Sequence, residues 1–261
     1  MLIDVHCHLT GDDYEVVGGL DGVVARAIDQ GVGRMICSGY DLATSYEAMA
    51  LSERHAEVYF SAGFHPSELA KYKSGDLERL EEICRHEKCV AVGEIGLDYH
   101  FDDNPSKELQ KELFVAQMRL ADSLGLPIVV HSRDAAQDTL AILQENAALL
   151  KRGGLLHCYS YSAEMLDAFL ALGLYFSFGG PCTFKNANKV QKCVQMVPGG
   201  RILAETDCPY LTPVPHRGEF PNQPANVVWV AKQMANLRQE EEKEFEEKVF
   251  DNAKRLFFKM K

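Results

Sequence analysis

Histidines and acidic residues follow short apolar runs at widely separated points of this chain. His6 and His8 stand one residue apart at the end of such a run, and a β-strand would direct both imidazoles to the same face. Glu94 lies between two glycines after another run, where a buried carboxylate is costly unless positive charge compensates it. The remaining members of this set are His131, His157 and Asp207. Imidazoles and carboxylates bind divalent cations, so we expect a metal centre in which Glu94 bridges two ions.

Each member of the set comes at the end of a segment that has the pattern of a β-strand. Such segments recur eight times, at residues 2–8, 35–37, 58–62, 90–92, 128–130, 155–156, 174–176 and 202–204. Helical patterns lie between them, at residues 20–30, 44–54, 76–86, 106–124, 135–150, 163–172 and 186–197, and residues 239–261 are expected to form the last outer helix. This alternation predicts one domain, residues 1–261, folded as a (β/α)8 TIM barrel.

A closed barrel would bring the set together, because TIM barrels gather the C-terminal ends of their strands around one site. An open sheet in chain order would hold the first and eighth strands roughly seven spacings of about 4.8 Å apart. The prediction of a metal site at the C-terminal strand ends therefore depends on closure. Asp4 has the same strand parity as His6 and is expected to orient one of the imidazoles.

The composition is that of a globular protein, with 46% hydrophobic and 25% charged residues in 261. A formal net charge of −11 argues against a broad basic surface for nucleic acid, although bound divalent cations would reverse the sign locally. The eight cysteines include no C-x-x-C pair and are expected to be reduced and mostly buried in a cytoplasmic protein. No apolar run approaches the roughly 20 residues of a transmembrane helix, so no membrane association is expected.

Five further residues are expected near the barrel mouth. His65 comes at the end of the third strand, where it would contact the substrate or act as an acid. Arg133 shares strand parity with the histidine two residues earlier, and its guanidinium suits a phosphate or carboxylate, with a salt bridge at the rim as the alternative. Glu205 is expected to support the centre or contact the substrate. Arg217 and Asn222, in the loop after the eighth strand, are candidate substrate-binding residues, with a solvated turn as the alternative.

These residues lie in short motifs that span nearly the whole chain. The motifs are D-V-H-C-H at residues 4–8, G-F-H-P at 63–66, G-E-I-G-L-D-Y at 93–99, L-P-I-V-V-H-S-R at 126–133, H-C-Y-S at 157–160 and E-T-D-C-P-Y-L at 205–211, followed by Arg217-Gly218, Asn222 and Pro224. In this order they resemble the TatD-related metal-dependent deoxyribonucleases, in the amidohydrolase-like superfamily of TIM barrels. The resemblance implies one metal on His6, His8, Glu94 and Asp207, and a second on Glu94, His131 and His157.

The metal-ligand set predicts a divalent-metal-dependent hydrolase, and the resemblance implies a deoxyribonuclease that acts as an exonuclease or phosphodiesterase. Two cations would lower the pKa of a shared water, and the resulting hydroxide would attack phosphorus. In catalysis Glu94 would hold both metals and Asp207 would take the water's proton, while His65 or Arg133 would offset developing charge. The mixed ligand set suits Mg, Mn, Zn or Co without choosing among them.

The implied substrate is DNA, single-stranded or at frayed ends, and no obligate protein partner is expected. Two alternatives remain open. The same metal pair could hydrolyse carboxylic esters, amides or lactones, including the acyl bond of an acylated nucleic acid, because a fold does not fix its substrate. A non-catalytic binding protein could also keep the fold, but the loss of a ligand would be its sign, and the six ligand positions are intact.

Overall fold

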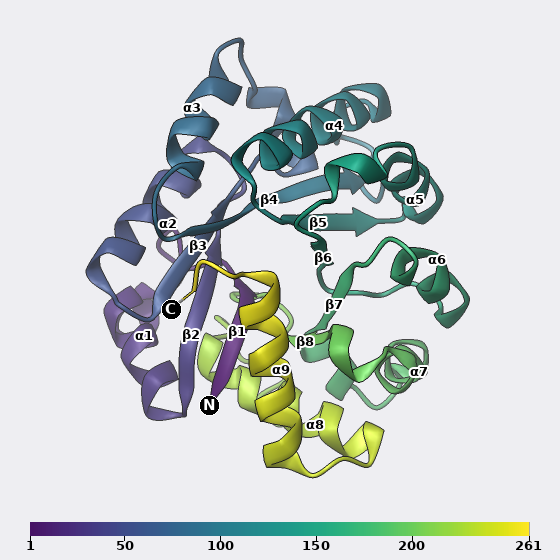
Figure 1. Cartoon of the computed structure of the whole chain (residues 1–261). Helices are drawn as coiled ribbons and strands as arrows, with labels where there is room; N and C mark the ends of the chain where they lie inside the picture. The colour runs from purple at the N-terminus through teal and green to yellow at the C-terminus, as the bar shows by residue number, and fades with distance from the viewer. Residues whose placement is uncertain (261) are drawn as a thin grey trace.

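Eight parallel strands lie in one sheet whose order follows the chain, which confirms the predicted (β/α)8 barrel (Figure 1). The computed structural model describes residues 1–260. The strands are β1 (Leu2–Cys7), β2 (Val32–Ser38), β3 (Val58–Ala62), β4 (Cys89–Asp98), β5 (Ile128–Arg133), β6 (Gly154–Leu156), β7 (Tyr175–Phe178) and β8 (Ile202–Ala204). β4 continues beyond Glu94 to Asp98, so this carboxylate projects from within the strand and not from its end.

Helices connect successive strands and surround the barrel (Figure 1). They are α1 (Gly19–Asp29), α2 (Leu42–Arg54), α3 (Asp76–Cys84), α4 (Lys107–Leu124), α5 (Ala136–Glu145), α6 (Leu166–Leu170), α7 (Asn188–Met196), α8 (Val227–Arg238) and α9 (Glu242–Leu256). The sequence predicted a helix at each of these places except α8. That helix begins Val227-Val228-Trp229-Val230, and β-branched and aromatic residues are typical of strands.

The barrel closes where β1 meets the chain that follows β8. The backbone N–H of His8 donates to the carbonyl oxygen of Cys208 at 2.7 Å. The backbone N–H of Asp207 donates to the carbonyl oxygen of His6 at 3.0 Å. These two bonds join the edges that an open sheet would leave apart, and they set one predicted metal ligand beside another.

The C-terminal helix α9 is not the last outer helix, contrary to expectation. The outer position after β8 belongs to α8, whereas α9 packs against β1 and β8 and lies across the barrel in Figure 1. Residues at its C-terminal end share a buried apolar cluster with side chains from all eight strands: Ala253, Leu256, Phe257 and Met260 with Ile3, Val5, Ile36, Tyr59, Val90, Val129, Leu155, Tyr175 and Leu203. Since Ile3 and Val5 lie early in β1, α9 covers the N-terminal end of the barrel, opposite the predicted ligands.

The remaining expectations from composition concern cysteines and membranes. All eight cysteines are free thiols, and seven of them are buried. Burial raises the pKa of the Cys158 thiol well above its usual value, so this partly exposed cysteine is not a thiolate at neutral pH. Within residues 1–260, no helix has the length and apolar character needed to cross a membrane.

Candidate metal centre

The six predicted ligand residues converge at the C-terminal ends of the strands. They come from within or directly after β1 (His6 and His8), β4 (Glu94), β5 (His131) and β6 (His157), and from the turn after β8 (Asp207). Five of them line a cleft of about 580 Å³, and the sixth, His6, lies beneath it with no exposed surface. The closed barrel therefore brings together side chains that are 201 positions apart at the extremes, from 6 to 207.

One carboxylate oxygen of Glu94 faces a first group of ligand atoms. Its Oε2 lies 3.3 Å from Nε2 of His6 and 3.5 Å from Nε2 of His8. Oδ1 of Asp207 completes the group, 3.6 Å from Nε2 of His6 and 3.4 Å from Nε2 of His8. The two imidazole nitrogens are themselves 3.2 Å apart. Four potential ligand atoms therefore point into one small space.

The other oxygen of Glu94 faces a second group. Its Oε1 lies 2.8 Å from Nδ1 of His131 and 2.8 Å from Nε2 of His157. These two nitrogens are 3.3 Å apart. The second group adjoins the first, because the rings of His6 and His157 stack with their centroids 4.0 Å apart. Glu94 thus stands between two groups, which is the position that a carboxylate shared by two cations requires.

The outer nitrogens of two ligand histidines face acceptors. Nδ1 of His8 lies 2.9 Å from the carbonyl oxygen of Ser38, and Nε2 of His131 lies 3.2 Å from Oδ2 of Asp98. A carbonyl oxygen or an ionised carboxylate can only accept, so in the neutral ring the outer nitrogen carries the proton. The inner nitrogen then keeps its lone pair for a cation. Acceptors behind metal-binding histidines commonly fix the tautomer in this way.

The other two ligand histidines have polar side chains behind their outer nitrogens. Nδ1 of His6 lies 3.1 Å from the hydroxyl oxygen of Ser38. Nδ1 of His157 faces Oε1 of Glu205 at 3.8 Å and is buried without a hydrogen-bond partner within the described chain. Hydrogen bonds therefore position the outer nitrogens of His8, His131 and His6, whereas Glu205 lies near the outer nitrogen of His157 beyond hydrogen-bond distance.

Ser38 and Asp98 are supporting residues that the sequence did not reveal. Each is the last residue of its strand, β2 or β4, so the strand-end position was the signal that could have marked them. Asp98 is held in place by the backbone N–H of His100, which donates to its Oδ1 at 2.9 Å. The rings that these two residues orient lie on β5 and just after β1, which no local spacing rule connects to β2 or β4.

Burial and the charges of neighbouring side chains shift the pKa values of the residues at the centre in different directions. Burial raises the pKa of Glu94, but the surrounding histidines outweigh this and hold it well below its usual value. Burial lowers the pKa of His157, yet the Glu94 carboxylate raises it to about 10. Burial likewise lowers the pKa of His8, which Asp207 and Glu94 raise to about 9. Without metal, these two rings hold protons at neutral pH where cations would bind.

His65 has the opposite tautomer. Its Nδ1 accepts the backbone N–H of Ser67 at 3.2 Å, and a backbone amide can only donate. The ring proton therefore lies on Nε2, which is 3.5 Å from Oε1 of Glu94. Burial, aided by His131, lowers the pKa of His65 to about 3, so the ring is neutral. His65 offers an N–H to the cleft and no lone pair to a cation.

Two unusual backbone conformations position the ligands. Gly96 has φ of +142°, and a Cβ there would lie 2.0 Å from the carbonyl oxygen of His131, so glycine allows β4 to approach β5 closely. Asp207 has φ of +55°, a left-handed conformation that aspartate adopts more readily than most residues. It turns the chain three residues after the end of β8.

Glu205 and Asn222 do not reach the cleft, which corrects the expectation that they contact substrate. Both have 0% of their surface exposed. Glu205 stands behind His157, and the Asn222 amide donates to the carbonyl oxygens of Thr206 and Tyr210 at 3.2 Å and 2.7 Å. Their positions give both residues a supporting role, one behind a ligand and one inside the loop after β8.

The two candidate arginines differ in position. Arg133 is exposed and lines the cleft, where its guanidinium lies 5.0 Å from the ring centroid of Phe101. Arg217 is exposed too, but it stacks on Phe184 at 4.0 Å and is not among the cleft-lining side chains of residues 1–260. Arg133 alone therefore keeps its expected place near a substrate.

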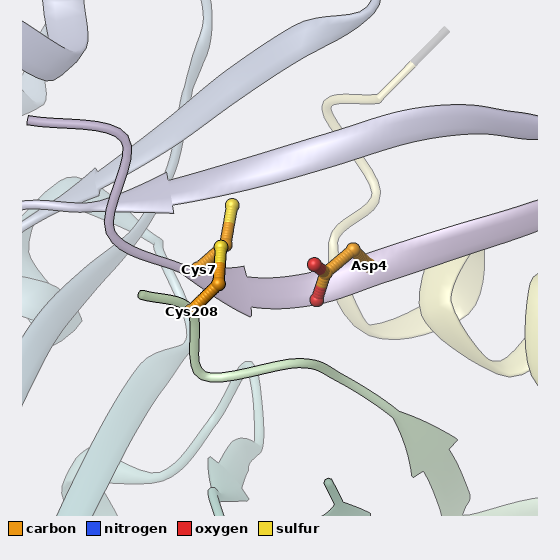
Figure 2. A group of neighbouring side chains, drawn as sticks. All are labelled: Asp4, Cys7 and Cys208. Atoms are coloured by element: carbon orange, nitrogen blue, oxygen red, sulfur yellow. The ribbon is translucent and has the colours of Figure 1, made fainter. Parts of the chain in front are cut away.

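Asp4 does not orient an imidazole, contrary to expectation. The pairing of β1 with β2 is irregular between Asp4 and Cys7, so strand parity no longer relates Asp4 to His6. Its carboxylate instead accepts the N–H and hydroxyl of Thr206 at 2.9 Å and 2.5 Å. Figure 2 shows Asp4 with Cys7 and Cys208 where β1 meets the chain after β8, with ligand atoms within 4.8 Å of one another. We call these three residues the seam cluster.

The residues around Glu94 fit divalent cations. Their inner nitrogens and carboxylate oxygens face one another at 2.8 Å to 3.6 Å, and acceptors behind His8 and His131 leave the inner nitrogens of these two rings as lone-pair donors. Such a convergence of acceptors in a buried place needs positive charge between them. Mixed imidazole and carboxylate sets suit Zn, Mn, Co or Mg.

Comparisons with known proteins agree with this donor set. The family described as TatD related DNase matches residues 3–258. YabD of Bacillus subtilis (strain 168), named an uncharacterized metal-dependent hydrolase, is 42% identical over 257 residues, which cover 98% of this chain and 99% of the relative. The 3'-5' ssDNA/RNA exonuclease TatD of Shigella flexneri serotype 5b (strain 8401) is 30% identical over 260 residues, 98% of each chain.

A solved structure shows the same likeness in three dimensions. The crystal structure of YJJV, a TatD homologue from Escherichia coli K12, matches with a TM-score of 0.91 at 31% identity, over 98% of each chain. The agreement thus extends along the sequence and over the whole barrel. The chain therefore belongs to the family of TatD-related DNases.

Proposed function

We propose that this protein is a divalent-metal-dependent phosphodiesterase that hydrolyses DNA, single-stranded or at frayed ends. The observation that carries the proposal is the position of Glu94, which turns one oxygen to each of two groups of ligand atoms. Membership of the TatD-related DNases supports a nuclease, and one relative is named an exonuclease of single-stranded DNA and RNA. Paired metals about a shared carboxylate are common in enzymes that cleave phosphate esters.

The two groups of ligand atoms assign the residues that would hold the cations. The first cation would lie on His6, His8, Glu94 and Asp207, and the second on Glu94, His131 and His157. When bound, divalent cations supply Lewis acidity, which makes water a better nucleophile and polarises a phosphoryl oxygen. The carbonyl oxygen of Ser38 and the carboxylate of Asp98 would keep the rings of His8 and His131 in the orientation that binding needs, and Glu205 lies behind His157.

Asp207 is placed to accept a proton from the attacking water. Burial raises its pKa, but the hydrogen bond from His8 and the nearby His6 lower it below the usual value, so the carboxylate is ionised at neutral pH. Its side chain lines the cleft and is 16% exposed, which leaves it accessible to water. Proton transfer to a positioned carboxylate is ordinary general base catalysis.

His65 is placed to donate a hydrogen bond to a phosphoryl oxygen. The Nε2–H of His65 lies 3.5 Å from Oε1 of Glu94, at the centre of the proposed metal site. The low pKa of His65 keeps the ring neutral throughout the physiological range. A preorganised neutral donor stabilises developing negative charge without losing a proton. Arg133 at the rim adds a permanent positive charge, with a planar fork that matches phosphate oxygens.

The experiment that tests this function changes His131 to Ala. We expect His131→Ala to lose most of its bound metal and its hydrolysis of single-stranded DNA, because the ring supplies an inner nitrogen to the second group. His55→Ala is the matched control, since the His55 ring pairs with Asp21, lies outside both groups and does not line the cleft. Metal content is measured by elemental analysis and hydrolysis by the release of nucleotides.

Two results would contradict the proposal. One is full metal content and full hydrolysis in the His131→Ala variant. The other is a wild-type protein that, loaded with Mg or Mn, hydrolyses carboxylic esters, amides or lactones while leaving phosphodiesters intact. The second result would make the acyl hydrolase the better description of the same centre.

A further inference from the structure

We propose that the cleft binds single-stranded nucleic acid through two aromatic side chains, Phe101 and Tyr210. Each ring would stack on a base next to the scissile phosphodiester. We call this pair the base clamp. The proposal rests on the proposed nuclease function and adds to it the residues that hold the strand. It also requires the bases at the site to be unpaired.

Both rings are exposed beside a polar centre. Phe101 has 51% of its surface exposed and Tyr210 has 58%, and both line the cleft. Exposed aromatic surface contributes little to folding, because apolar groups stabilise a fold by leaving water. Two such rings at the rim of one cleft are therefore better explained by a ligand that covers them.

The two rings belong to opposite sides of the barrel mouth. Phe101 follows β4, and Tyr210 follows β8. In a closed ring of eight strands in chain order, β4 and β8 lie four strands apart by either route. The metal-ligand side chains gather at the mouth that these two strands border. A phosphodiester placed at Glu94 would then have one aromatic ring on the side of each neighbouring nucleotide.

Further side chains give each ring a defined setting. Tyr210 lies 6.4 Å from the ring of Phe220, and Tyr40, which also lines the cleft, lies 5.8 Å from the ring of His8. On the side of the barrel mouth that Phe101 occupies, the guanidinium of Arg133 lies 5.0 Å from the ring centroid of Phe101. A base stacked on Phe101 would thus bring its own phosphate near a guanidinium.

The charge of the cleft favours stacking as the source of affinity. Among the cleft-lining side chains of residues 1–260, Arg133 is the one Lys or Arg, whereas Asp13, Glu68 and Asp98 line the cleft in addition to the two ligand carboxylates. For each phosphate contact on a single strand, the logarithm of the binding constant falls by about 0.7 for every tenfold rise in salt concentration. With one arginine at the site, we expect a shallow salt dependence. Stacking of a base on an aromatic ring, by contrast, strengthens binding about 5- to 150-fold.

Stacking of this kind selects unpaired bases. In a duplex the faces of each base are covered by its neighbours, and an enzyme must extrude a base before a side chain can stack on it. Single strands and frayed ends expose those faces without that cost. Every base has an aromatic face, so the clamp would bind strands with little regard to sequence.

The test measures binding separately from hydrolysis. A labelled oligothymidylate with phosphorothioate linkages, which resist cleavage, is titrated with the full-length protein in the presence of Mn, and fluorescence anisotropy gives the dissociation constant. The variants are Phe101→Ala and Tyr210→Ala, with Tyr210→Phe to keep the ring. Phe258→Ala is the control, because Phe258 is also exposed, at 46%, and does not line this cleft.

We expect each alanine variant of the clamp to bind about 5- to 150-fold more weakly, and Tyr210→Phe and Phe258→Ala to bind like the wild type. A strand of base-free sugars should bind the wild type as weakly as oligothymidylate binds a variant in which both Phe101 and Tyr210 are changed to Ala. Unchanged affinity in both alanine variants, or equal binding of strands with and without bases, would overturn the clamp. A ring-dependent affinity in a protein that cleaves no phosphodiester would support the clamp and contradict the nuclease.

Discussion

Two buried clusters of metal-ligating side chains lie close together in this barrel, and they differ in how their polar atoms are satisfied. Around Glu94, the inner nitrogens and carboxylate oxygens face each other, and acceptors lie behind the rings of His8 and His131. In the seam cluster, Asp4 accepts the N–H and hydroxyl of Thr206 and the backbone N–H of His6. The thiol of Cys7 donates to the carbonyl oxygen of Ile36. The first cluster has spare lone pairs, whereas in the second the protein's own donors already bind the Asp4 carboxylate and the Cys7 thiol is itself a donor.

The two buried carboxyl groups respond to these surroundings in opposite directions. Burial raises the pKa of Asp4 well above its usual value, whereas the histidines around Glu94 hold its pKa well below. Asp4 is therefore disposed to hold a proton and Glu94 to remain an anion. Residue type and proximity alone would rank the clusters equally, since each has at least three ligand atoms within 4.8 Å. The presence or absence of internal donors separates a metal site from a structural contact.

The most severe test of this contrast removes the charge of Glu94. We expect Glu94→Gln to weaken metal binding more than about 100-fold, because its two oxygens serve both groups and supporting residues alone are worth about 10- to 100-fold. The measurement is metal content after dialysis. Glu164→Gln, at an exposed carboxylate, is the control. Wild-type metal content in the Glu94 variant would show that the shared carboxylate is not a ligand.

A smaller effect is expected from Asp98, which stands behind His131. Asp98→Asn should weaken metal binding about 10- to 100-fold, because an amide N–H directed at Nε2 would favour the wrong tautomer of the ring. Metal titration gives the dissociation constant directly. If the constant is the same as in the wild type, the orientation of the ring does not depend on this carboxylate.

Metal affinity should also rise with pH. In the metal-free protein His8 and His157 have pKa values raised to about 9 and about 10, so at neutral pH a cation must displace their protons. Affinity should therefore increase about tenfold per pH unit for each displaced proton, until the pH reaches these values. Titration calorimetry in buffers with different heats of ionisation counts the protons released. Binding without proton release at neutral pH would contradict the protonated rings.

The smallest effect on metal binding is expected in the seam cluster. Cys208→Ala should leave metal content unchanged, while the loss of a buried sulfur lowers the free energy of unfolding by about 1 kcal/mol. Metal analysis and urea denaturation measure the two quantities. Loss of a stoichiometric metal in this variant would mean that the seam cluster binds a cation after all.

The part of the site that could be predicted from sequence is the set of residues at the ends of strands. His131 and His157 directly follow apolar runs, and closure of the barrel made those run ends neighbours. Asp4 was assigned wrongly, because parity holds only in an unbroken strand and β1 is irregular between Asp4 and Cys7. Ser38 and Asp98 escaped notice, because a bond such as that between Ser38 and His8 joins positions 30 residues apart.

In the fold, too, elements determined by local sequence could be predicted, and elements determined by contacts between distant residues could not. The strands could be predicted because buried parallel strands are continuous apolar runs. α8 could not, because its β-branched start has the local preference of a strand and becomes helical by packing against its neighbours. The position of α9 likewise depends on the apolar end of the assembled barrel, which exists only after eight strands have met.

The position of α9 has a consequence for synthesis of the protein. The inner face of β1, with Ile3 and Val5, leaves the ribosome well before Ala253 and Phe257, which cover it and lie about 250 positions later in the chain. A growing chain must therefore leave an apolar surface uncovered until these later residues have been made, and exposed apolar surface binds chaperones or aggregates. Truncations or tags that disturb residues 253–260 should be harmful for this reason, although they lie at the far end of the barrel from the chemistry.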